Sequence, residues 1–126
     1  MRVLFQKEYY RHNGRISLAT IGIPNMIDRL SKENLPIDLW ISLHAVDDRK
    51  RKEIMPIAHK YALNDLLYTA KKYSKRVAKP VWLNYMLFRG FNDKTSDIKN
   101  LTKILKGNEK FFNLIITEPN NDLEKF

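Results

Sequence analysis

Short apolar segments alternate with amphipathic segments along this chain, and this alternation constrains the fold more than any other feature. The apolar segments are rich in isoleucine, valine, leucine and aromatic residues and cover residues 16–20, 37–43, 81–88 and 111–116. Their length and composition are typical of β-strands. Their near-continuous hydrophobicity predicts strands that are covered on both faces, as in a parallel sheet.

Helical periodicity lies between these segments. Pro24 is a favourable first helical residue, and the apolar residues after it recur at helical spacing as far as Asn34. A second periodic segment covers residues 63–73, and a third covers residues 98–105. Alternating strands and helices joined by right-handed crossovers predict an α/β fold with four parallel strands.

The 126 residues fit one domain, because domains cluster near roughly 100 to 150 residues. We expect residues 1–126 to form a single domain, with an irregular lead-in over residues 1–14, the α/β part over residues 15–119 and a tail over residues 120–126. Four parallel strands cannot close a barrel, which needs about eight strands, and an open sheet leaves two unpaired edges. The expected architecture is a parallel (βα) half-barrel that more chain or a second copy completes.

Composition limits the chemistry. The sequence contains no cysteine, which excludes disulfides, a thiolate nucleophile and an iron–sulfur cluster ligated by this chain alone. The 23 lysines and arginines against 14 acidic residues give a net charge of +9, which favours nucleic acid, acidic membranes or phosphorylated ligands. No segment approaches the roughly 20 apolar residues of a membrane span, so we expect a cytoplasmic protein with no membrane partner.

Ligands of parallel α/β sheets meet the loops that follow the carboxyl ends of the strands, so the strand exits should gather on one rim. Ser42 and His44 follow the second strand, where they serve either as ligand contacts or as ordinary structural groups. Asn92 and Asp93 are most simply a turn and a helix cap. Glu118 follows the last strand, but spacing places no second carboxylate beside it.

The three histidines are scattered, so the sequence predicts neither a metal site nor an assignable catalytic residue. A run of four cations follows the second strand exit and consists of Arg49, Lys50, Arg51 and Lys52. The run either grips RNA phosphates at the ligand rim or forms the solvated face of a helix capped by Asp47 and Asp48.

Five motifs follow one another in register: RISLATIGI at 15–23, WISLHA at 40–45, IMPI and KY at 54–61, YML and GFND at 85–93, and LK and NLI at 105–115. Over about residues 15–119 they resemble the latter part of the RlmN/Cfr family. Those proteins are radical S-adenosylmethionine (SAM) enzymes that methylate an adenine carbon in ribosomal RNA and, for some members, in transfer RNA.

The resemblance implies a partial TIM-type barrel whose strand ends hold SAM against a 4Fe–4S cluster. The resemblance implies that Ser42, Leu43 and His44 contact SAM, because they match the SAM-contacting segment of the family. It also implies ribosomal or transfer RNA as a partner. The cluster belongs to the parent family only, because no residue here matches its cysteines. The chain is expected to supply part of the SAM-binding and RNA-facing wall without performing the reaction alone.

Two residues depart from the family pattern. Ala19 replaces a serine, and Glu118 replaces the asparagine of an Asn-Pro pair. A lost hydrogen bond costs about 1 kcal/mol, and a carboxylate beside that of SAM is unfavourable. These departures leave open a non-catalytic RNA-binding or interaction module derived from the same fold. Half-barrels that pair as a homodimer through their open edges are a third interpretation.

Overall fold

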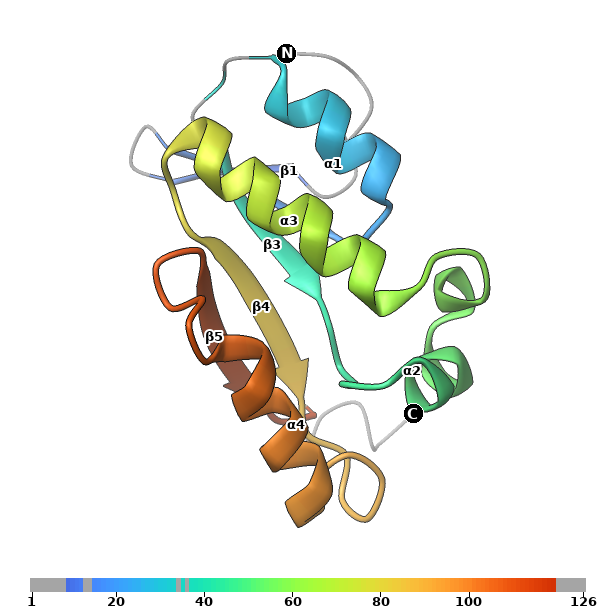
Figure 1. Ribbon diagram of the computed structural model, residues 1–126. Coiled ribbons are helices and arrows are strands. Elements are labelled where there is room, and N and C mark those ends of the chain that lie inside the picture. The colour runs from blue at the N-terminus through green and yellow to red at the C-terminus, as the bar shows by residue number, and fades with distance from the viewer. Residues whose placement is uncertain (1–8, 13–14, 34, 36, 120–126) are drawn as a thin grey trace.

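A five-stranded sheet forms the centre of the molecule (Figure 1). The computed structural model describes residues 9–12, 15–33, 35 and 37–119. The strands lie in chain order and are β1 (Tyr9–His12), β2 (Arg15–Thr20), β3 (Ile37–Ser42), β4 (Val81–Met86) and β5 (Phe112–Thr117). The four strands from β2 to β5 pair in parallel, which confirms the predicted α/β class and the four predicted strands.

β1 corrects one expectation. It pairs antiparallel with β2, with Tyr9 opposite Leu18 and His12 opposite Arg15. An irregular lead-in was expected over residues 1–14, and for residues 9–12 this expectation is wrong. The free edge of β2 offers unpaired backbone groups, and a short preceding segment satisfies them as an antiparallel edge strand. Residues 1–8, 13–14 and 120–126 of the expected lead-in and tail lie outside the described residues.

Helices connect the parallel strands. α1 (Pro24–Ser31) begins at the predicted proline, and α3 (Leu63–Val77) and α4 (Thr95–Leu105) follow the other two periodic segments. A short helix, α2 (Asp48–Ile54), and a 3-10 turn, η2 (Pro56–His59), lie between β3 and α3. Figure 1 shows α1 and α3 side by side and α4 near the carboxyl end of β4.

The helices pack on one face of the sheet, where strand residues such as Leu18, Leu39 and Leu83 are buried. On the opposite face the rings of Trp40 and Trp82 stack with centroids 4.9 Å apart and an interplanar angle of 10°. Both tryptophans are only half-buried, so within the described chain the prediction of strands covered on both faces is wrong. In β3 and β4 the tryptophans on this open face contribute to the near-continuous hydrophobicity. None of the described helices is long and apolar enough to cross a membrane.

Candidate ligand site at the strand carboxyl ends

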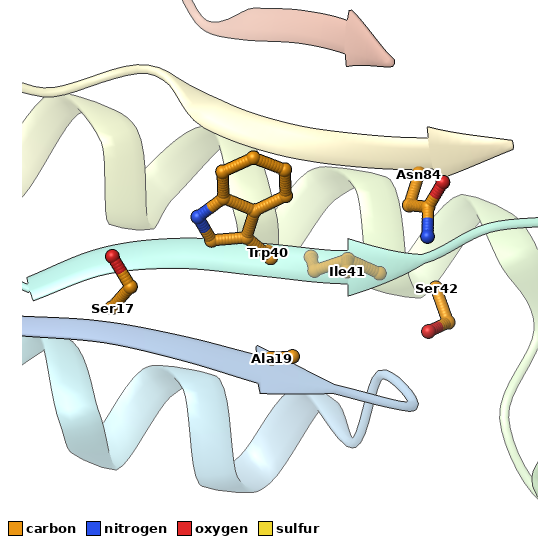
Figure 2. A pocket seen from close by; sticks show the side chains of 6 residues that line it. All are labelled: Ser17, Ala19, Trp40, Ile41, Ser42 and Asn84. Atoms are coloured by element: carbon orange, nitrogen blue, oxygen red, sulfur yellow. The ribbon is translucent and has the colours of Figure 1, made fainter. Parts of the chain in front are cut away.

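A hollow of about 320 Å³ lies on the open face of the sheet. Figure 2 shows its lining residues, Ser17, Ala19, Trp40, Ile41, Ser42 and Asn84. Ser42 and Asn84 are register partners of β3 and β4, so the two polar side chains meet near the carboxyl ends of these strands. Hydroxyl and amide groups beside an aromatic ring on an otherwise apolar wall suit a small organic molecule with polar substituents.

The predicted SAM-contacting segment turns sharply at this rim. The half-buried side chain of Ser42 lines the hollow, whereas Leu43 is fully buried in the helix-covered core. His44 has a φ of 55°, and the N–H of Ala45 donates back to the carbonyl oxygen of Leu43 at 2.7 Å. The three predicted residues therefore lie together at the strand exit, but only Ser42 and His44 offer side chains outside the core.

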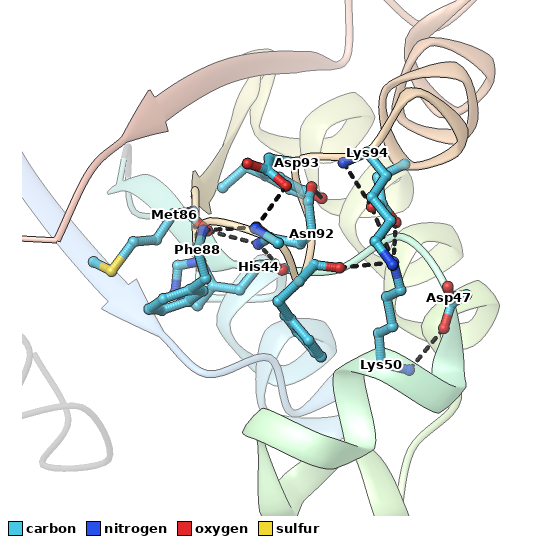
Figure 3. A network of polar contacts seen from close by, with 12 residues as sticks. His44, Asp47, Lys50, Met86, Phe88, Asn92, Asp93 and Lys94 are labelled. Carbon is cyan, nitrogen blue, oxygen red and sulfur yellow. Dashed lines mark hydrogen bonds and ion pairs between the residues drawn. The ribbon is translucent and has the colours of Figure 1, made fainter.

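The imidazole of His44 is held by the exit of β4. Its Nδ1 accepts the backbone N–H of Met86 at 3.0 Å (Figure 3). Burial lowers the pKa of His44, and the positive charge of Arg51 lowers it further. The ring is therefore neutral at pH 7 and carries its proton on Nε2, because Nδ1 is the acceptor. His44 thus offers one N–H donor to a ligand.

Asn92 joins the exits of β3 and β4. Its side-chain amide nitrogen donates to the carbonyl oxygens of His44 at 2.8 Å and Met86 at 2.7 Å (Figure 3). Its Oδ1 accepts the N–H of Phe88 at 2.7 Å. Tyr85, whose pKa burial and nearby carboxylates raise to about 12, donates its hydroxyl to the Asn92 carbonyl oxygen at 2.6 Å. The predicted turn is present, and it also locks the loop that supports His44.

Arg51 joins the exits of β2 and β3. Its Nε donates to the carbonyl oxygen of Leu43 at 3.2 Å, and its Nη2 donates to those of Ile21 at 3.1 Å and Ser42 at 3.2 Å. Gly22 has a φ of +95°, and a Cβ there would lie 2.8 Å from Cδ2 of Leu66 and 3.2 Å from this Nη2, so the backbone conformation and both neighbours favour glycine. The side chain is fully buried, so the expectation that Arg51 contacts RNA is wrong.

Of the other three cations in the run, Lys50 makes contacts within the protein, whereas Arg49 and Lys52 are exposed to solvent. The Nζ of Lys50 lies 2.7 Å from a carboxylate oxygen of Asp97 and 2.8 Å from the carbonyl oxygen of Phe91. Asp47 caps α2 by accepting the N–H of Lys50, as the helix interpretation predicted. Arg49 and Lys52 are exposed, and these two remain available to an anion.

Other candidates lie apart from the hollow. Asp93 accepts the N–H of Gly90 at 2.9 Å and completes the turn, while the helix cap itself falls on Lys94. Glu118 is exposed after β5. In the described part of the chain, no three histidine, aspartate or glutamate residues are grouped so as to hold a metal ion.

The sequence pattern located the strand exits but not the role of Arg51 and Asn92 in holding them together. The bonds of Arg51 and Asn92 reach carbonyl groups up to 48 positions away in the chain. No local pattern reports such partners. A buried cation needs several hydrogen-bond acceptors, and these come together only once the strands are assembled.

The fold is similar to part of a solved radical SAM methyltransferase. A crystal structure of such an enzyme from Sphaerobacter thermophilus superposes with a TM-score of 0.74 and 27% sequence identity, over 79% of this chain and 29% of that one. No family model matches the sequence.

Within that class the sequence is RlmN/Cfr-like. Proteins described as probable dual-specificity RNA methyltransferase RlmN are 43% identical over 101 residues in Pseudothermotoga lettingae and 40% identical over 112 residues in Thermotoga petrophila. The matches cover 80% and 88% of this chain, but only 29% and 33% of those proteins. The relative from Thermus thermophilus is 38% identical over 83% of the chain. The chain thus spans about a third of the length of these curated relatives.

Proposed function

We propose that the chain forms part of the SAM-binding and RNA-facing wall of an RlmN/Cfr-like radical SAM RNA methyltransferase. The observation that carries this proposal is the position of Ser42 and His44, which lie at a strand exit beside a hollow in a fold of that class. RNA adenine methylation is then the reaction of the whole enzyme, and the cytoplasm is its place of action.

The donor set fits SAM. The Ser42 hydroxyl, the Nε2–H of His44 and the amide of Asn84 can bond carboxylate and hydroxyl oxygens, and Trp40 offers an apolar surface. Nη1 of Arg51, which is buried and has no hydrogen-bond partner among the residues that the structure describes, adds positive potential behind the rim. SAM, when bound, supplies the methyl group. The residues of this chain bind and orient it.

The residues do not fit an iron–sulfur cluster. The sequence has no cysteine and therefore offers no thiolate ligand. The proposal assigns this chain no step through the cluster.

In this proposal RNA phosphates contact Arg49 and Lys52, which are exposed on α2 near the same strand exits. The alternative of a non-catalytic RNA-binding module depended in part on four free cations in this run. Arg51 and Lys50 are committed to internal contacts, which favours the methyltransferase wall over the module.

Calorimetric titration of SAM into the chain and into His44→Ala tests the site. We expect measurable binding that weakens about tenfold or more in His44→Ala, which corresponds to the loss of about 1.4 kcal/mol. His59→Ala, at an exposed histidine, is the matched control and should bind as the unsubstituted chain does. Equal and negligible heats for all three proteins would remove the assigned role.

A chimera tests the function. Residues 15–119 replace the matching segment of a full-length RlmN relative, and mass spectrometry measures adenine methylation of RNA. We expect methylation that falls in the same chimera carrying His44→Ala. A chimera that melts cooperatively and binds RNA without methylating it would instead favour the non-catalytic module.

A further inference from the structure

A cationic hollow lies at the amino ends of the parallel strands, at the opposite pole from the candidate SAM site. Phe111, directly before β5, is one of its lining residues. The Nζ atoms of Lys71, Lys75 and Lys110 lie 4.8, 5.4 and 5.3 Å from the centroid of this ring. The first two lysines come from successive turns of α3, and the third comes from the loop before β5. Two separate segments thus bring three cations to one ring.

These three lysines have no carboxylate partner among the described residues, unlike their neighbours. Lys79 pairs with Asp38 at 3.2 Å, and Lys72 lies 3.8 Å from Asp28. Three ammonium groups around one ring repel one another, and the ring quadrupole offsets this repulsion only in part. A bound anion would relieve it.

Lys75, Lys110 and Phe111 line a concavity of about 290 Å³, together with Ser74 and with Lys79, which pairs with Asp38. Lys71 lies against the same ring but is not part of this lining. The C-terminal dipole of α3 accounts for a cation in its last turn, such as Lys75. It does not account for Lys110, which lies outside the helix, nor for Lys71 in an earlier turn. The hollow therefore has the shape and charge of a phosphate site.

We propose that this hollow binds the phosphodiester backbone of RNA. The inference rests on the proposed function, since it names a second contact for the same RNA. A six-residue strand at about 3.3 Å per residue separates the two poles by roughly 20 Å. This distance is shorter than the length of duplex, roughly 16 base pairs, that double-stranded RNA-binding domains cover, so one RNA duplex is long enough to reach both poles. Exposed Lys72 and Arg76 extend the positive surface along α3, which suits a linear polyanion better than a single small anion.

Salt-dependent RNA binding tests the proposal. Fluorescence anisotropy of a labelled RNA hairpin is measured between about 50 and 200 mM salt for the full chain and for Lys71→Gln/Lys75→Gln/Lys110→Gln. The matched control is Lys99→Gln/Lys103→Gln/Lys106→Gln, which removes the same charge from exposed positions on and just after α4. We expect the hollow variant to lose about tenfold or more in affinity. Its log–log salt slope should fall by about two, since each phosphate contact contributes roughly 0.7 to 0.9.

The outcomes are separable. Equal losses in the two triple variants, no RNA binding by the unsubstituted chain, or tighter binding to phosphatidylserine vesicles than to RNA would overturn the proposal. Circular dichroism melting confirms that both variants fold. Calorimetric SAM titration of the hollow variant should match that of the unsubstituted chain. Absence of SAM binding then contradicts the proposed SAM site at the strand exits. An unchanged salt slope in the hollow variant contradicts the proposed RNA contact around Phe111.

Discussion

At the scale of single residues, the buried guanidinium of Arg51 fixes the exits of β2 and β3 relative to each other. Its planar fork reaches three carbonyl oxygens, those of Ile21, Ser42 and Leu43. A lysine ammonium is a point charge on a shorter reach and does not match this geometry. The candidate site therefore depends on a residue that contacts no ligand itself.

Replacing Arg51 should destabilise the fold. We expect Arg51→Met to lower the free energy of unfolding by about 2 to 4 kcal/mol, because it leaves buried carbonyl groups without donors. Arg51→Lys should recover little of this loss. Denaturant unfolding measures the effect, and Arg49→Met at the exposed neighbour should stay within about 0.5 kcal/mol of the unsubstituted chain. Similar losses at both positions would contradict the assigned contacts.

Asn92→Asp tests the hydrogen bonds of Asn92 with a side chain of the same size as asparagine. It replaces an amide nitrogen that donates to the carbonyl oxygens of His44 and Met86 with a carboxylate oxygen that cannot donate. We expect a loss of about 3 kcal/mol or more in unfolding free energy, because the group is fully buried. Thermal unfolding of Asn64→Asp, at an exposed position, provides the control. A melting temperature for Asn92→Asp equal to that of the control would rule out the network.

The lowered pKa of His44 predicts a pH dependence of stability. The unfolded histidine has a pKa near 6.5 and the folded one a lower value, so the unfolded chain binds more protons between these two values. Stability should therefore be fully present above about pH 6.5 and should fall on acidification, by at most about 1.4 kcal/mol per pH unit. His44→Asn, which tolerates the positive φ, should show a shallower decline between about pH 7 and 5. Parallel declines in the two proteins would contradict this account.

The positions of the candidate site residues were easier to predict from the sequence than the contacts around them. Ser42 lines the hollow and His44 follows two residues later because β3 ends at Ser42, and the hydrophobic pattern marks that end. The burial of Arg51 could not be predicted, because its neighbours Arg49 and Lys52 are exposed and its acceptors come from other strands.

At the scale of elements, the short helix α2 is joined to the first turn of α4. Lys50 of α2 pairs with Asp97 of α4, whose side chain is 2% exposed. An ion pair with one buried partner loses much when one member is removed, since the other charge stays uncompensated.

A double-mutant cycle measures this coupling. We expect Lys50→Met, Asp97→Asn and the double variant to give a coupling energy of at least about 1 kcal/mol. The same cycle on Lys32 and Asp28, an i,i+4 pair on the surface of α1, should give a much smaller value. If the surface pair couples as strongly as the buried pair, the role assigned to Lys50 fails.

The elements themselves were largely predictable. Four parallel strands and three of the helices follow directly from the apolar segments and their periodicity. β1 was missed because Tyr9–His12 has no hydrophobic alternation of its own and pairs by covering the free edge of β2.

At the scale of the whole molecule, one face of the sheet is covered by helices and the other carries the stacked Trp40 and Trp82. The candidate SAM hollow lies on this open face at the carboxyl ends of the strands, and the cationic hollow around Phe111 lies near their amino ends. The two proposed functions are thus assigned to separate ends of one rigid sheet.

The most direct test is an amide NMR titration of the isotope-labelled chain with SAM. The account predicts chemical-shift changes confined to the strand exits, at residues 20–22, 42–45 and 84–86, with the amides around Phe111 unchanged. Shift changes centred on Phe111, or an unchanged spectrum at millimolar SAM, would contradict it.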